Sequence, residues 1–139
     1  MDKQIGYLIK RVQQELRSRM DVELQQVNLT TAQYAALNAL EETPNLSNAA
    51  LARACFITPQ TMIEIVQGLQ ALGYIVRQSH PEHGRIIQTK LTTLGSEQVA
   101  SAHKIVAKIE AKMILGLTSS EQKMLANYLE KCRINLERN

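Results

Sequence analysis

Within five residues the chain carries an amide, a hydroxyl, a branched apolar side chain and a carboxylate, at Gln60, Thr61, Ile63 and Glu64. Groups of these kinds distinguish base pairs in the DNA major groove. An amide pairs with adenine through two hydrogen bonds, hydroxyl and apolar groups contact thymine, and a carboxylate accepts a hydrogen bond from cytosine. The same four side chains could also form a solvated helix face, so the elements that carry them must decide between the two interpretations.

Four cationic side chains lie on either side of this segment, at Arg53, Arg77, Arg85 and Lys90. An arginine in a projecting loop suits a narrow minor groove, where negative potential is concentrated, and we assign this role to Arg85. We expect Arg53, Arg77 and Lys90 to contact phosphate groups. For each of these three residues, a merely solvated cation is an equally good interpretation.

Two helices joined by a tight turn are predicted for residues 47–73. Ser47 is a natural N-cap of the first helix, and Leu51 with Ala54 should give that helix its buried stripe. Thr58 caps the second helix, and the proline that follows it occupies the first helical position, where a missing N–H costs nothing.

The second helix has apolar residues at helical spacing and ends at Gly73. Its predicted buried face comprises Met62, Ile65, Val66, Leu69 and Leu72. The amide, hydroxyl, apolar and carboxylate side chains described above therefore point outward from the first turns of this helix.

A β-hairpin with a polar tip is predicted next, with strands at Tyr74–Gln78 and Arg85–Leu91 around a turn at Pro81–Gly84. A helix-turn-helix followed by such a wing fits DNA, because a major groove about 12 Å wide admits one helix whose first turn reaches the base edges. This context favours base recognition over a solvated face. It also places the two N-cap side chains, Ser47 and Thr58, at the same surface.

The segment resembles the winged helix-turn-helix of the MarR family of bacterial regulators. The residues that carry the resemblance are Leu51-Ala52, Thr58-Pro59-Gln60-Thr61, Leu69, Gly73, Arg85, Leu91-Thr92 and Gly95. The resemblance extends over nearly the whole chain, because helical segments flank the core in the family's order. It implies a DNA-binding transcriptional regulator, most simply a repressor that binds a pseudo-palindromic operator as a homodimer and responds to a small aromatic effector.

Two features depart from the family's pattern. The family's wing usually reads Asp-Arg-Arg, in which the acid orients the arginine, whereas this chain has His83-Gly84-Arg85. The family's recognition helix often carries basic residues where this chain has Glu64 and Gly68. These differences favour an alternative function, that of a winged-helix protein-interaction module with weakened DNA affinity.

Long amphipathic helices are predicted on both sides of the winged segment. Residues 3–27 carry an apolar stripe formed by Ile5, Leu8, Ile9, Val12, Leu16, Met20 and Leu24. A second long helix carries Val99, Ala102, Val106, Ile109 and Met113. Capping boxes at Thr30–Gln33 and Thr118–Glu121 begin two further helices, the second of which carries Leu125, Leu129, Cys132 and Leu136.

No remaining part of the chain can cover the terminal apolar stripes, and the resemblance implies that a second subunit covers them. We therefore expect a dimer interface that includes Leu8, Val12, Leu125, Leu129, Cys132 and Leu136. The predicted fold is mostly α-helical with one small hairpin. It forms a single domain over 1–139, with a DNA-binding lobe at about 30–95 and dimerisation helices at 1–28 and 96–139.

The composition agrees with one globular domain, at 139 residues with 45% hydrophobic and 21% charged residues. A net charge of +3 permits binding to a polyanion without requiring it. Two cysteines indicate a reducing compartment rather than a disulfide framework. We find no secretion signal and no membrane-spanning run, so we expect the cytoplasm.

No motif supports catalysis or a bound cofactor, and we expect neither. A metal could be ligated by His80, Glu82 and His83, but a polar wing tip is the favoured interpretation. Cys55 could respond to oxidation, although a small buried hydrophobic residue is the better interpretation. We expect His103 to be a surface residue.

Overall fold

The computed structural model describes residues 4–138, so the predicted domain limits at 1 and 139 and the first residue of the predicted 3–27 helix lie outside the described residues. The elements are α1 (Ile5–Glu23), η1 (Leu24–Val27), α2 (Thr31–Glu42), α3 (Asn48–Ala54), α4 (Pro59–Ala71), β1 (Ile75–Ser79), β2 (Ile87–Leu91), α5 (Thr93–Met113) and α6 (Ser119–Glu137). The prediction of a mostly helical fold with one hairpin is therefore confirmed.

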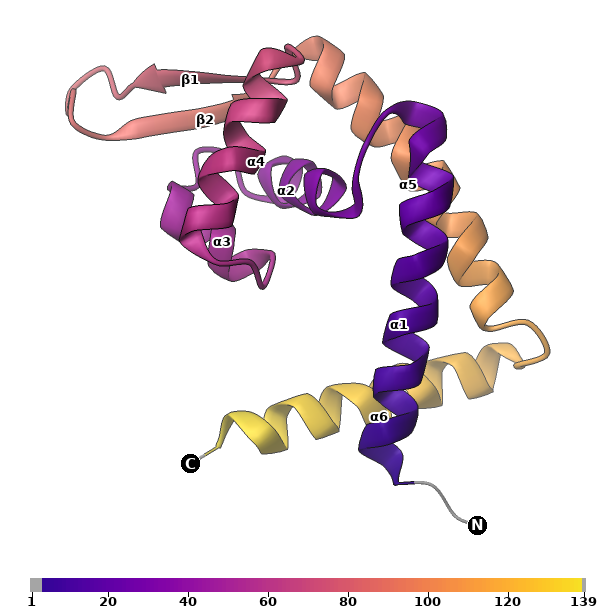
Figure 1. Cartoon of the computed structure of the whole chain (residues 1–139). Helices are drawn as coiled ribbons and strands as arrows, with labels where there is room; N and C mark the ends of the chain where they lie inside the picture. The colour runs from indigo at the N-terminus through magenta and orange to yellow at the C-terminus, as the bar shows by residue number, and fades with distance from the viewer. Residues whose placement is uncertain (1–3, 139) are drawn as a thin grey trace.

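The elements form two parts, which Figure 1 shows side by side. The first part, called the lobe, consists of α2, α3, α4 and the hairpin, which projects away from the rest of the molecule. The second part, called the arm, consists of α1 packed along α5, with α6 running across their far end. The lobe and the arm meet where α2 packs against α5 and α1, and where the start of α5 adjoins β2.

Side-chain caps begin the helices as their sequences predict. The hydroxyl groups of Thr30, Ser47, Thr58 and Thr118 each accept a hydrogen bond from a backbone N–H in the first turn of the following helix. Both predicted capping boxes form as well. Each satisfied N–H removes one of the unpaired donors at a helix start, so the boundaries of these helices are set locally.

The core lies mainly in the lobe and continues along the inner side of α5. Its largest fully buried side chains are Leu24, Leu37, Leu40, Leu51, Met62, Leu69, Ile75 and Val99. The prediction of Ala54 as a core residue is wrong, because the short helix α3 packs between α2 and α4 through Leu51 and its neighbour Ala52. Leu72 is 44% exposed because it is the C-cap residue, beyond the packed face of α4.

The hairpin is antiparallel and pairs Ile75 with Leu91 and Ser79 with Ile87. The predicted first strand is displaced by one residue, and the second strand begins two residues later than predicted. Arg85 therefore lies in the loop rather than in a strand. The loop is closed by a hydrogen bond from the backbone N–H of His80 to the carbonyl oxygen of Ile86, at 2.8 Å.

The arm leaves large apolar side chains exposed. Neither α1 nor α6 contains a buried residue. Leu8 on α1 is 47% exposed and Leu129 on α6 is 46% exposed, although both lie on apolar helix faces. No helix among residues 4–138 is long and apolar enough to cross a membrane.

Candidate DNA-binding interface

The first turn of α4 presents the predicted base-reading groups to solvent. Gln60 is exposed, and its side chain makes no hydrogen bond with any described residue. The Thr58 hydroxyl accepts a hydrogen bond from the Thr61 backbone N–H at 3.2 Å and donates to the Thr61 hydroxyl oxygen at 3.0 Å. Thr61 therefore keeps its own hydroxyl hydrogen for an acceptor on a base edge.

The position of α4 depends on a contact that the sequence analysis missed. The Asn48 side-chain amide, at the start of α3, donates a hydrogen bond to the Pro59 carbonyl oxygen at 3.3 Å. This bond joins the first turns of the two helices. No pattern of spacing could have identified it, because the two residues meet only when the turn between the helices folds.

That turn contains a residue in an unfavourable conformation. Phe56 has a φ of 56°, in the left-handed region, and its side chain is 97% exposed. A left-handed backbone costs roughly 1–2 kcal/mol for residues other than glycine. No burial of the ring in this chain offsets that cost.

The second turn of α4 continues the outward surface. Ile63 is 43% exposed, and Glu64 is exposed without an ion pair among the described residues. Both side chains thus lie on the face predicted for base contacts, on the same side of the helix as Gln60 and Gln67.

The wing tip is ordered by His80 and not by a carboxylate. His80 Nδ1 accepts hydrogen bonds from the backbone N–H groups of Glu82 at 3.0 Å and His83 at 3.1 Å. Arg85 is exposed and makes no hydrogen bond or ion pair within residues 4–138, which agrees with the missing acid at position 83. Among those residues, no group of three or more His, Cys, Asp or Glu side chains is placed to hold a metal ion.

The remaining predicted phosphate contacts lie on separate surfaces of the lobe. Arg77 pairs with Thr89 and Lys90 pairs with Val76, so Arg77 and Lys90 extend from opposite faces of the hairpin. When one face of the hairpin lies against DNA, only one of these two cations is on that face. Arg53 is exposed in the last turn of α3, and Ser47 is exposed at its start.

Cys55 ends α3 and is half-buried against the core. Burial raises the pKa of the Cys55 thiol, which favours the unreactive protonated form. This environment supports the interpretation of Cys55 as a packing residue.

Comparison with known proteins places the chain in a family. A sequence model of the MarR family matches residues 27–86, from η1 to the wing. Over 130 residues, covering 94% of both chains, the chain is 32% identical to the HTH-type transcriptional repressor Rv2887 of Mycobacterium tuberculosis. The chain belongs to the MarR family.

Solved MarR structures agree with this assignment. Rv2887 in complex with salicylic acid superposes with a TM-score of 0.80 at 31% identity, covering 94% of this chain and 97% of that chain. Rv2887 in complex with DNA gives 0.79 at 30% identity, covering 94% and 98%. Wild-type MarR from E. coli gives 0.83 at 22% identity, covering 95% and 98%, which shows the shared fold. As a MarR-family protein, the chain is a DNA-binding transcriptional regulator.

Proposed function

We propose that this MarR-family chain forms a homodimer that represses transcription by binding a pseudo-palindromic operator, and that a small aromatic effector releases it. The observation that carries the DNA-binding part is the first turn of α4, where exposed amide and hydroxyl groups follow a capped helix start. In this arrangement α4 enters the major groove, with Gln60 on adenine and Thr61 and Ile63 on thymine.

Contacts outside the major groove hold the lobe in register. Arg85 extends from the wing loop into the adjacent minor groove. Ser47, Thr58 and Arg53 approach phosphate groups from the helix-turn-helix, together with one of the two hairpin cations. Glu64 contacts cytosine, since a carboxylate facing phosphate would be repelled.

The arm supplies the dimer interface in this proposal. Its support is the exposed apolar surface on α1 and α6, which includes Leu8, Val12, Leu125, Leu129 and Leu136 together with the exposed Cys132. A hollow of about 300 Å³ between α1 and α5 belongs to the same surface, and its lining includes Val12, Leu16, Ile109 and Met113. We assign dimerisation to about 1–28 and 96–139, and DNA binding to about 30–95.

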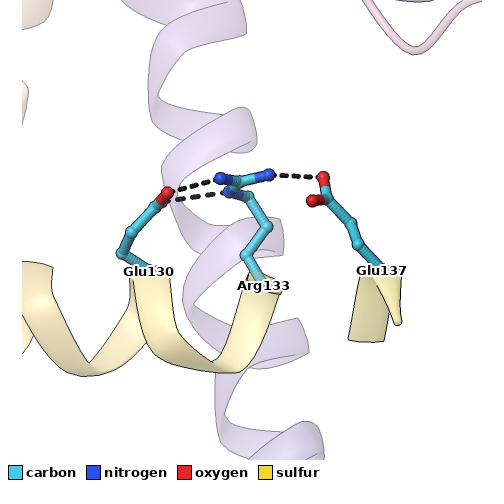
Figure 2. Close-up of polar contacts among 3 residues, drawn as sticks. All are labelled: Glu130, Arg133 and Glu137. Atoms are coloured by element: carbon cyan, nitrogen blue, oxygen red, sulfur yellow. Dashed lines mark hydrogen bonds and ion pairs between the residues drawn. The ribbon is translucent and has the colours of Figure 1, made fainter. Parts of the chain in front are cut away.

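Charged side chains on α6 adjoin its apolar face without interrupting it. Figure 2 shows the Arg133 guanidinium between Glu130 and Glu137 on the last turns of the helix. Arg133 Nε donates to Glu130 at 3.0 Å, and the hydrogen bond with Glu130, followed by the charges of both acids, raises the pKa of Arg133. By helical spacing this network lies beside the stripe of Leu125, Leu129 and Leu136, so it can stay hydrated at the rim of an interface.

The effector class rests on the relative. Rv2887 has been crystallised with salicylic acid, a small aromatic carboxylic acid. We propose an effector of the same class for this chain, acting on the repressor by shifting it to a state that binds DNA less well.

Binding to two duplexes at two salt concentrations tests the proposal. One duplex carries the DNA beside the protein's own gene, and the other carries a scrambled sequence of equal length. We expect tighter binding to the first duplex and a steep loss of affinity between about 50 and 200 mM salt, because bound cations displace counterions from phosphate. Addition of salicylate should release the protein from the first duplex. Weak binding to both duplexes with a shallow salt dependence would instead favour the protein-interaction module.

A further inference from the structure

Three polar side chains form a continuous hydrogen-bonded chain between the lobe and the arm. The Tyr34 hydroxyl lies 2.7 Å from His103 Nδ1, and His103 Nε2 lies 2.8 Å from Glu41 Oε1. Tyr34 and Glu41 are two helical turns apart on α2, so they share one face of that helix. His103 extends from α5 and contacts both. His103 lies partly at the surface, as expected, but the sequence analysis did not predict its two hydrogen-bond partners.

An ionised Glu41 and a neutral His103 together set the direction of each hydrogen bond. An ionised carboxylate only accepts, so Nε2 of His103 carries a hydrogen and donates it to Glu41. In a neutral imidazole, Nδ1 then accepts from the Tyr34 hydroxyl. Burial and the charges of Glu110, Glu41 and Glu42 raise the pKa of Tyr34, so the hydroxyl keeps the hydrogen that it donates. The two rings meet edge to face, with centroids 5.5 Å apart.

The hydrogen bonds among Tyr34, His103 and Glu41 lie at the junction of the lobe and the arm. Helix α2 packs on α3, α4 and β2 within the lobe, whereas α5 packs on α1 within the arm. Helices α2 and α5 also contribute buried apolar side chains, such as Leu37 and Ala102, to the same hydrophobic core. Apolar contacts have no preferred direction and permit small rotations, whereas hydrogen bonds weaken steeply when they are bent.

We propose that the Tyr34–His103–Glu41 chain is a positioning device that fixes the orientation of the lobe on the arm, and so sets the half-site spacing that the dimer accepts. This inference rests on the proposed dimeric binding of DNA. In a two-fold dimer the distance between the two α4 helices depends on how each lobe sits on its arm. A lobe held at one angle therefore fits one spacing between half-sites.

Four variants separate this role from general packing. His103→Leu introduces an apolar side chain of similar bulk and removes both hydrogen bonds. Tyr34→Phe removes only one hydroxyl. His103→Gln can still accept from Tyr34 and donate to Glu41, and serves as the rescue variant. Lys104→Leu, at the neighbouring exposed position on α5, is the matched control.

The first measurement is the distance between spin labels on α4 and α1, at the exposed positions Gln67 and Gln14, in a protein with alanine at both native cysteines. Labelled chains are diluted with unlabelled chains, so that each signal comes from within one subunit. We expect one narrow distance distribution in the parent protein, in His103→Gln and in Lys104→Leu. His103→Leu and Tyr34→Phe should broaden it while melting remains cooperative. An unchanged distribution in both variants would overturn the inference, whatever the DNA results.

The second measurement is selection from a random-sequence duplex library. The parent protein should enrich two-fold symmetric sites with one dominant spacing. His103→Leu should enrich the same half-site at several spacings. It should bind the parent's site at least about 3- to 10-fold more weakly, because the loss of a single hydrogen bond already accounts for that range. Enrichment of the parent's single spacing by the variant would contradict the inference. If the parent protein enriches no symmetric site, dimeric recognition fails, and the label distances still decide whether this chain of residues orients the lobe.

Discussion

At the scale of single residues, base recognition depends on the side chains that the first turn of α4 leaves unpaired. Gln60 is the clearest of these, because its amide is exposed at the second position of the helix and bonds to no described residue. Arg85 is equally unpaired, but it stands on a loop and must be ordered when it binds.

Gln60→Ala should weaken binding to the operator by roughly 1–3 kcal/mol and relax the preference at one base pair in each half-site, since it removes a two-point contact with adenine. Titrations on the operator and on scrambled DNA measure both effects. Gln70→Ala, exposed at the other end of α4, is the control and should change little. An equal loss on both duplexes would show that Gln60 does not read a base.

Phe56→Gly should raise the free energy of unfolding by about 0.5–1 kcal/mol. The backbone strain that glycine relieves is larger than the entropic cost of its greater freedom in the unfolded chain. Removal of the ring costs no hydrophobic burial, because the ring is exposed. Phe56→Ala retains the strain, so it should leave stability nearly unchanged. Urea unfolding of the three proteins decides the matter. A glycine variant less stable than the parent would indicate that the Phe56 ring is covered in the dimer.

Cys55 should react slowly with thiol reagents at neutral pH. Its raised pKa leaves less thiolate than an ordinary cysteine has, and thiolate is the reactive form. In the Cys132→Ser protein, where Cys55 is the remaining thiol, we expect a slower reaction in the folded than in the urea-unfolded state. A folded protein that reacts as fast as the unfolded one would revive the interpretation of Cys55 as an oxidant sensor.

At the scale of elements, the start of α5 is the point where the lobe is joined to the arm. The Thr92 hydroxyl caps α5 by accepting from Gly95 N at 3.0 Å, and it donates to the Gly73 carbonyl oxygen at 2.6 Å. Gly95 packs directly on the backbone of Tyr74, so a side chain at this position would collide with the Tyr74 carbonyl. The hairpin and α5 are therefore held together by backbone proximity.

Gly95→Ala should destabilise the protein by about 3 kcal/mol or more, at or beyond the upper end of the usual cost of overpacking, because backbone atoms cannot move aside as a flexible side chain can. Gly84→Ala in the wing is the control, since open space surrounds that position. Thermal melts of both proteins give the comparison. Equal melting temperatures would mean that α5 shifts without cost.

At the scale of the whole molecule, the arm exposes apolar surface that no other part of the described chain covers. Its two terminal helices contain no buried residue, yet each carries an apolar face. A core shared between two chains would bury these faces, and burial of each leucine would stabilise the dimer by about 1.5–3 kcal/mol.

Leu129→Glu should dissociate the homodimer or unfold it, because a carboxylate without a partner would be buried between subunits. Asn127→Glu introduces the same charge away from the apolar stripe of α6 and should leave the dimer intact. Sedimentation at micromolar concentration measures both variants. A stable, folded monomer of the unsubstituted chain would contradict the dimer proposal.

Features that depend on neighbours along the chain could be predicted from residue types and spacing. The caps at Ser47 and Thr58, the capping boxes at Thr30 and Thr118, and the helix end at Gly73 all formed as predicted. Each involves groups within one or two turns, so residue types and spacing suffice to predict them. The outward face of α4 could be predicted for the same reason, because helical periodicity separates it from the buried face.

The packing of the elements determines which distant groups meet. His103 lies 69 residues from Tyr34 and 62 from Glu41, so no local pattern links them. The burial of Ala52 in place of Ala54 depended on how α3 packs between two other helices, and the separation of Arg77 from Lys90 depended on strand register. These outcomes arise from packing between elements, where the geometry of the neighbour and not the local sequence selects the side chain that makes the contact.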